Sequence, residues 1–125
     1  MAAYRAMWRD AAVVSRTPDP KDPRLDDHAR KKALWLLQYL MERLQTKGAA
    51  SAGEMKVAPR VVKSTAAKVE LLDCTDDSDW LEVERGAPSD GLSTGHYRTE
   101  ATVVLASGKW MVSDLYSEAA GSCMG

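Results

Sequence analysis

The stretch HYRTEATVVLASGKWMVSDLY, residues 96–116, decides the fold class of this chain. Two runs rich in β-branched and aromatic residues, His96 to Leu105 and Trp110 to Tyr116, flank the short segment Ala106 to Lys109. Runs of this kind favour strands, and a Ser-Gly pair between two such runs is typical of a tight antiparallel turn. The sequence therefore predicts a β-hairpin over residues 96–116.

Further strands are predicted upstream of this hairpin. After Gly53 the spacing of apolar residues changes from the helical period to the alternation of a strand. We expect strands over Met55 to Ser64, Ala67 to Cys74 and Trp80 to Glu84, with a loop at Ala87 to Gly91. The second half of the chain thus predicts an antiparallel sheet.

The first half of the chain shows the helical period. Within residues 3–15, apolar side chains recur at steps of three and four, as expected of an amphipathic helix. A second apolar stripe runs through residues 29–46, and Gly48 is a suitable C-terminal stop. The stripes consist of Tyr4, Met7, Trp8, Ala11 and Val14, and of Ala33, Leu36, Leu37, Leu40, Met41 and Leu44.

A proline-rich break separates the two helices. Pro18 and Pro20 cannot continue the first helix, and Asp22 before Pro23 is a start signal for a short helical turn. Helices followed by strands argue for an α+β fold, with N-terminal helices packed on a curved antiparallel sheet. We expect a single domain over residues 1–125, with helices at about 3–46, strands at about 54–116 and a tail at 117–125.

Cys74 and Cys123 are the only cysteines, and each lies beside a predicted strand. An isolated pair at this separation favours a disulfide over a metal site, which needs more ligands at closer spacing. We therefore expect a disulfide that tethers the tail, and with it an oxidising, extracytoplasmic compartment. The chain opens without a signal-peptide pattern, so we expect any signal or membrane anchor to lie outside it.

The net charge of −1 conceals an uneven distribution. Residues 1–68 carry 14 Lys and Arg against 7 Asp and Glu, whereas residues 69–125 carry 3 against 11. The favoured interpretation is a basic helical half packed beside an acidic sheet half. The alternative is a basic face directed at anionic lipid, cell-wall polymer, nucleic acid or an acidic protein. Nucleic acid fits least, because no binding motif accompanies the basic residues.

Several short motifs occur in a recognisable order: the segment Asp19 to Leu25, the strand end Asp73 to Asp76, the segment Gly108 to Val112, and the terminal Gly121 to Cys123. In this order the chain resembles the small secreted or membrane-anchored NTF2-like (cystatin-like, SnoaL-like) proteins of high-GC Gram-positive bacteria. The resemblance covers nearly the whole chain. It implies a cone of helices over a strongly curved sheet, with a pocket between them, and a function that is non-catalytic in most members.

The resemblance also brings an enzymatic alternative, because NTF2-like relatives include ketosteroid isomerases and polyketide cyclases. Such enzymes need a carboxylate base in an apolar pocket that faces a hydroxyl donor. Asp114 is the strongest candidate, since alternation places it on one strand face with Trp110, Val112 and Tyr116. The other candidates are Asp10, interpreted as a surface charge, His96, interpreted as exposed, and the hydroxyls of Tyr4 and Tyr97. A carboxylate touching a tyrosine in a roomy cavity would favour an enzyme, and a cavity plugged by Trp8 and Trp110 would favour a binding module.

We expect no catalytic residues, no metal and no cofactor. His28 and His96 are isolated, and neither belongs to a catalytic triad or a zinc site. The acidic run from Asp73 to Glu84 resembles a calcium loop, but Ser78 stands where the sharp turn of such a loop needs glycine. An acidic turn between strands is the better interpretation.

The sequence thus predicts an extracytoplasmic binding or protein-interaction module, such as an accessory domain of a secretion, conjugation or cell-envelope system. The expected partner is another protein or a second copy, bound through the sheet face, with a small apolar ligand as a further candidate. Nucleic acid is not expected, and a membrane only through an anchor outside this chain. The candidate pocket consists of Tyr4, Trp8, Trp35, Trp110, Asp114 and Tyr116.

Overall fold

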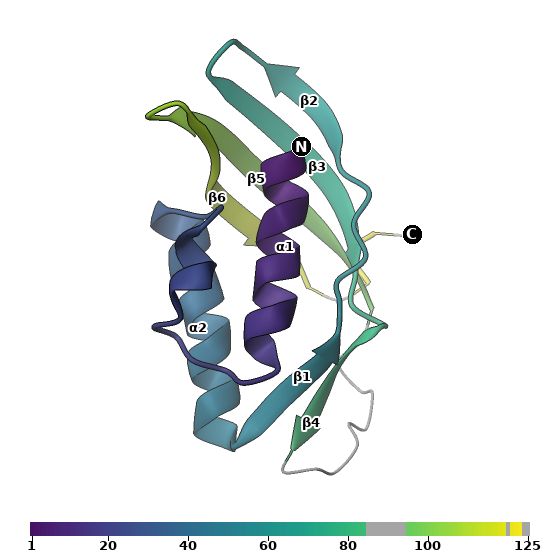
Figure 1. The fold of residues 1–125 in the computed structure, drawn as a ribbon. Helices are drawn as coiled ribbons and strands as arrows, with labels where there is room; N and C mark the ends of the chain where they lie inside the picture. The colour runs from purple at the N-terminus through teal and green to yellow at the C-terminus, as the bar shows by residue number, and fades with distance from the viewer. Residues whose placement is uncertain (85–94, 120, 124–125) are drawn as a thin grey trace.

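A computed structural model describes residues 1–84, 95–119 and 121–123. Figure 1 shows both α-helices lying against one face of a curved antiparallel sheet. In chain order the elements are α1 (Ala2–Ser15), the 3-10 helix η1 (Pro23–Asp26), α2 (Lys31–Lys47), β1 (Ala49–Gly53), β2 (Arg60–Ser64), β3 (Lys68–Asp76), β4 (Trp80–Glu84), β5 (His96–Ala106) and β6 (Lys109–Ser117). The architecture is α+β, as predicted. The predicted loop at Ala87 to Gly91 lies outside the described residues.

The predicted hairpin forms half of a four-stranded antiparallel sheet, in the order β2-β3-β5-β6. Its turn has Ser107 and Gly108 at φ angles of 52° and 80°. These left-handed conformations are the ones that a type I′ turn requires, and such turns match the twist of the flanking strands. The local sequence thus fixes the register of β5 against β6 at the turn.

A smaller sheet pairs β1 with β4. Its strand β4 has the predicted bounds, whereas β1 was not predicted. The first strand begins at Ala49, within a segment of small residues that lack strand propensity, and it forms because β4 supplies a complete antiparallel partner. The second strand begins at Arg60 instead of Met55, because Pro59 has no amide hydrogen to donate to a ladder. An isolated antiparallel bridge pairs Lys56, in the segment between β1 and β2, with Asp76 at the end of β3.

Both helices begin and end close to the predicted positions. The Asp22 carboxylate accepts a hydrogen bond from the Arg24 amide at 2.9 Å and caps η1. Gly48 ends α2 in the left-handed conformation, with φ of 68°. No helix among the described residues is long and apolar enough to span a membrane.

The core lies between the helices and one face of the four-stranded sheet. The side chains of α1 and α2 that point inward recur at helical spacing and meet the alternate residues of β3, β5 and β6. The fully or nearly fully buried members include Tyr4, Met7, Trp8, Ala11, Val14, Ala33, Leu37, Met41, Leu71, Val103 and Val112.

The outer edge of β6 is covered by the segment that precedes α2. Val112 donates its amide hydrogen to the His28 carbonyl at 2.8 Å and accepts one from the Arg30 amide at 2.9 Å. This segment satisfies edge groups that would otherwise be available for pairing with another strand. The opposite edge strand, β2, is exposed along its whole length.

Gly53 and Gly108 provide a matched pair of substitutions, since both have positive φ, at 94° and 80°. A Cβ added at Gly108 meets nothing within 4 Å, whereas one added at Gly53 would overlap the main-chain oxygen of Asp79. We expect Gly108→Ala to lower the free energy of unfolding by about 1–2 kcal/mol, the cost of a left-handed L-residue. Gly53→Ala should cost about 1–3 kcal/mol more, because the backbone must move. Urea unfolding measures both, and equal losses would contradict the close approach of β1 to the β3–β4 turn.

Candidate functional site

A buried polar pair lies at the centre of the helix-facing side of the sheet. The Tyr4 hydroxyl on α1 donates to Oδ2 of Asp73 on β3 at 2.7 Å. Oδ1 of the same carboxylate accepts the Ala58 amide hydrogen at 2.9 Å. Asp73 is only 4% exposed, and Tyr4 is fully buried. Burial raises the pKa of Tyr4 well above its usual range, and the charge of Asp73 raises it further, so the hydroxyl keeps its proton and acts as a donor.

Aromatic rings fill the space around this pair. Trp8 packs edge-on against Tyr4 at 6.4 Å between ring centroids, and against Trp80 at 6.0 Å. The Trp80 indole donates to the Ser15 hydroxyl at 3.0 Å. The buried indole N–H of Trp8 has no hydrogen-bond partner among the described residues. The space between α1 and the sheet is thus occupied by the protein's own side chains.

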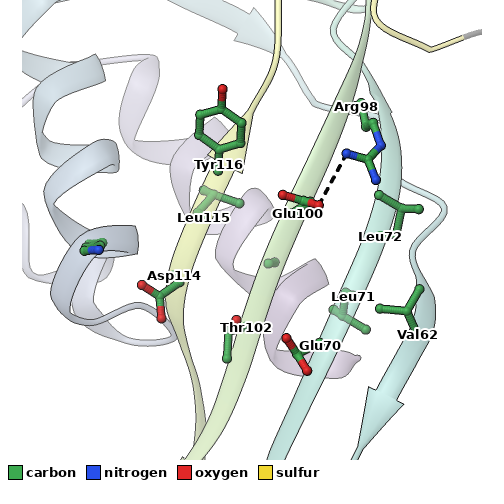
Figure 2. Close-up of a pocket in the computed structure, with 12 residues that line it drawn as sticks. Val62, Glu70, Leu71, Leu72, Arg98, Glu100, Thr102, Asp114, Leu115 and Tyr116 are labelled. Atoms are coloured by element: carbon green, nitrogen blue, oxygen red, sulfur yellow. Dashed lines mark hydrogen bonds and ion pairs between the residues drawn. The ribbon is translucent and has the colours of Figure 1, made fainter.

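A groove of about 610 Å³ lies on the opposite face of the four-stranded sheet. Apart from Lys32 on α2, its side chains come from the four strands of the larger sheet, with β6 at one side and β2 at the other (Figure 2). Its lining mixes apolar groups with both signs of charge: Lys32, Val62, Glu70, Leu71, Leu72, Arg98, Glu100, Ala101, Thr102, Asp114, Leu115 and Tyr116. Tyr116, on the β6 side of the groove, is 61% exposed.

Asp114 and Tyr116 reach this face because of an irregularity in β6. Val112 pairs with Val103, but Asp114 pairs with Thr102, so that Ser113 is an additional residue in β6. One inserted residue reverses the alternation of the residues that follow it. The prediction that Asp114 shares a face with Trp110 and Val112 is therefore wrong, since simple alternation takes no account of a bulge.

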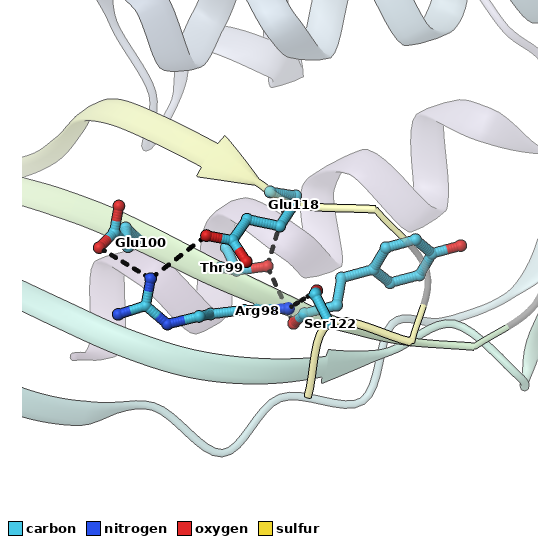
Figure 3. Close-up of polar contacts among 7 residues, drawn as sticks. Arg98, Thr99, Glu100, Glu118 and Ser122 are labelled. Atoms are coloured by element: carbon cyan, nitrogen blue, oxygen red, sulfur yellow. Dashed lines mark hydrogen bonds and ion pairs between the residues drawn. The ribbon is translucent and has the colours of Figure 1, made fainter. Parts of the chain in front are cut away.

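The C-terminal segment after β6 is held by a disulfide and lies at one end of the groove. Cys74 on β3 is joined to Cys123 in a disulfide, with a Cα–Cα distance of 6.0 Å. Hydrogen bonds to β5 hold the same tail (Figure 3), as the Arg98 amide donates to the Ser122 hydroxyl at 2.7 Å, and the Glu118 amide to the Arg98 carbonyl at 2.9 Å. The Arg98 guanidinium also lies 3.4 Å from Glu118 and 3.3 Å from Glu100. The tail is held by a small polar network as well as by the disulfide.

Comparison with known proteins identifies the fold of this chain, but it finds no relative by sequence. No family model matches the chain, and no curated protein has a similar sequence. Among solved structures, the intermembrane space region of the chloroplast protein ARC6 superposes with a TM-score of 0.66 at 11% identity, covering 95% of this chain and 93% of that one. The NTF2-like design Rd1NTF2_05 gives 0.51 at 11% identity, with coverage of 92% and 96%. The chain has an NTF2-like fold.

A third similar structure agrees with this assignment. A protein of Xanthomonas campestris, described as a calcium/calmodulin dependent protein kinase II association domain, superposes with a TM-score of 0.52 at 12% identity. The superposition covers 96% of this chain and 87% of that chain. At such low identity the likeness concerns the fold alone.

The six residues predicted to line the pocket of this NTF2-like fold do not line one cavity. Tyr4 and Trp8 belong to the buried core, and only Asp114 and Tyr116 border the groove. Trp110 is partly exposed at the end of the hairpin. Trp35 is 63% exposed on the outer side of α2, where its ring stacks on Tyr39 at 5.3 Å between centroids.

The remaining candidates form separate pairs. His28 Nδ1 lies 2.7 Å from Oδ2 of Asp10, which corrects the prediction that both are isolated surface groups. Sequence spacing could not reveal this contact, since the proline-rich turn brings the two residues together. The Tyr97 hydroxyl donates to Asp77 at 2.8 Å, and partial burial with this contact raises the pKa of Tyr97 to about 12. His96 lies 3.5 Å from Asp76.

The acidic residues that follow Cys74 have different partners. Oδ1 of Asp76 accepts the Ser78 amide hydrogen at 2.9 Å. A hydrogen bond with the Ser78 side chain, and then this one with its amide, lower the pKa of the Asp76 carboxyl. Asp79 pairs with Lys56 at 2.8 Å. In the described part of the chain, no group of three or more His, Cys, Asp or Glu side chains lies close enough to hold a metal ion.

Removing the Tyr4 hydroxyl tests the buried pair. We expect Tyr4→Phe to lower the free energy of unfolding by about 2–3 kcal/mol, because the buried Asp73 carboxylate loses a hydrogen bond that water cannot replace. Tyr116→Phe removes the same atom from an exposed ring and should change stability by less than about 0.5 kcal/mol. Urea denaturation of the two variants provides the comparison. A loss no larger in Tyr4→Phe than in Tyr116→Phe would show that the pair does not stabilise the fold.

Removing both cysteines tests the tether. The disulfide closes a loop with a sequence separation of 49 residues. We expect the Cys74→Ser, Cys123→Ser double variant to lose about 4 kcal/mol of stability, mainly through the greater freedom of its unfolded chain. A reducing agent should lower the unfolding midpoint of the native protein and leave that of the variant unchanged. Two alkylatable thiols in oxidised native protein would rule out the bond.

Proposed function

We propose that this chain is a non-catalytic protein-binding module, and that it binds through the open face of its four-stranded sheet. The observation that carries the proposal is the groove on that face, where the exposed Tyr116 of β6 and Leu72 of β3 lie on either side of the charged Glu100 of β5. Both α-helices pack on the other face.

The composition of the groove suits a protein partner. Protein interfaces combine an apolar centre with a polar rim, and they are enriched in tyrosine and arginine. Here Tyr116, Leu72 and Val62 are the apolar part, and Arg98 and Glu100 are a charged pair beside it. A broad sheet face open to water is less suited to a small apolar ligand, which is normally enclosed over most of its surface.

The filled interior supports a binding module over the isomerase alternative. The structure does contain a carboxylate in contact with a tyrosine, the Asp73–Tyr4 pair, which sequence reasoning named as the mark of an enzyme. Yet both residues are buried, and Trp8 packs against Tyr4 where a substrate would have to lie. Asp114, the other candidate base, is exposed on the opposite face.

The disulfide supports an extracytoplasmic location, because such bonds persist in oxidising compartments. Within this proposal the chain is one of the small secreted or membrane-anchored NTF2-like proteins of high-GC Gram-positive bacteria. It would then act as an accessory domain of a secretion, conjugation or cell-envelope system. One similar structure supports a role in association, since it is described as an association domain.

Site-specific photo-crosslinking tests the binding face. A photoreactive benzoylphenylalanine replaces Tyr116 on the sheet face, and in a matched variant it replaces Tyr39 on α2. Tyr39 is also an exposed tyrosine, but it lies outside the groove. After irradiation in the native host, we expect the Tyr116 variant to form a discrete crosslinked product with a protein, and the Tyr39 variant to form none. Equal crosslinking from both positions, or none from Tyr116, would contradict the proposal.

A further inference from the structure

We propose that the turns of the β2–β3 and β5–β6 hairpins bind directly to the surface of a bilayer that contains anionic phospholipid. Residues 63–69 and 104–111 make up this surface, which is called the hairpin end below. It is separate from the groove on the open face, so the proposal goes beyond the protein-binding function. The sequence predicted contact with a membrane only through an anchor outside this chain, whereas these turns would contact the lipid themselves.

Strand pairing brings the two turns together at one end of the sheet. The Leu105 amide on β5 donates to the Ala67 carbonyl in the other turn at 2.9 Å. Figure 1 shows both turns at the same end of the sheet, away from β1 and β4. Residues 63–68 and 107–110 are all exposed. The two turns therefore present one continuous surface to the solvent.

The hairpin end carries positive charge only. Its charged side chains are Lys63, Lys68 and Lys109, and it contains no Asp or Glu. All three lysines are exposed, and none of them has an ion-pair partner among the described residues. These cations are therefore available to an external anion.

The opposite end of the sheet carries the acids. The segment of residues 76–84, which includes the end of β3 and all of β4, contains five acidic residues and no Lys or Arg. The sheet is thus polarised along its strands, positive at the hairpin end and negative at the other. A negatively charged surface attracts the first end and repels the second, which orients the molecule.

An exposed apolar pair accompanies the lysines. Leu105 and Trp110 face each other across β5 and β6, one step beyond the buried pair of Val103 and Val112. They are 42% and 36% exposed. Tryptophan is favoured at the level of lipid headgroups, where its ring meets apolar chains and its N–H meets water. Leu105 and Trp110 therefore suit shallow insertion into a bilayer.

The combination favours a bilayer over other anionic partners. Lysine is depleted at protein interfaces, whereas each lysine near an anionic bilayer strengthens binding by about fivefold. A soluble polyanion would pair with the lysines but would leave the apolar pair in water. A bilayer uses both, because a lysine can lay its methylene stem along the apolar surface while its ammonium group reaches a phosphate.

Sedimentation of vesicles tests the role of the lysines. The probes are vesicles of phosphatidylcholine with an equal part of phosphatidylglycerol, and vesicles of phosphatidylcholine alone. We expect the native chain to bind the anionic vesicles about tenfold or more tightly, with an affinity that falls as salt is added. Lys68→Glu and Lys109→Glu should each weaken this binding by about tenfold, since each replaces an attraction with a repulsion. Lys21→Glu makes the same charge change in the proline-rich segment after α1 and should leave binding nearly unchanged.

Quenching by a phosphatidylglycerol with brominated acyl chains tests insertion. Bromine quenches only those indole rings that reach the acyl chains, so we expect part of the native tryptophan fluorescence to be lost on binding. Trp110→Ala should abolish this quenching and weaken vesicle binding by about threefold. Trp35→Ala removes a more exposed indole, from the outer side of α2, and should leave both the quenching and the affinity unchanged.

The outcomes separate the possible results. Selective binding to anionic vesicles that depends on Lys68, Lys109 and Trp110 supports the proposal. Equal binding to both kinds of vesicle, no binding, or an equal loss in Lys21→Glu overturns it. Binding that depends on the lysines without quenching of Trp110 would show a surface for soluble anions and would exclude insertion. Circular dichroism confirms that each variant is folded, and crosslinking from position 116 tests the open face independently.

Discussion

The hydrogen bond between Tyr4 and Asp73 is the interaction on which the rest of this structure depends. It joins the first helix to the middle of the sheet and satisfies a carboxylate that is almost wholly removed from water. A buried charge without such partners would be strongly destabilising, so the hydroxyl and the Ala58 amide fix the distance between helix and sheet. The same contact, together with Trp8, fills the space where an NTF2-like fold can hold a ligand.

Because the protein's own side chains fill the interior, the open face of the sheet is the surface that remains accessible to a partner. The side chains of that face follow from the register of four strands, and from the additional residue Ser113 in β6. Without the bulge, Asp114 and Tyr116 would point toward the helices, and the open face would lose both an acid and its largest ring. A local irregularity of one residue thus determines which side chains the open face carries at β6.

The tail and its disulfide delimit this face. Cys123 crosses back to β3, and the main chain near Arg98 binds Ser122 and Glu118, so that one end of the open face is occupied. This arrangement links two properties of the chain that the sequence presents separately. The disulfide that led us to expect an oxidising compartment also lies at the end of the open face of the sheet.

Local sequence determined the features that depend on neighbouring residues. The hairpin followed from a Ser-Gly turn between two strand-forming runs, α2 ended at Gly48, and the isolated cysteines indicated the disulfide. Tertiary structure decided what depends on distant partners. Ala49 to Gly53 became a strand only through β4, Asp10 met His28 across a turn, and the bulge at Ser113 reversed the face of Asp114. Periodicity describes how side chains alternate along one element, whereas pairing and burial are set by elements that lie far away in the chain.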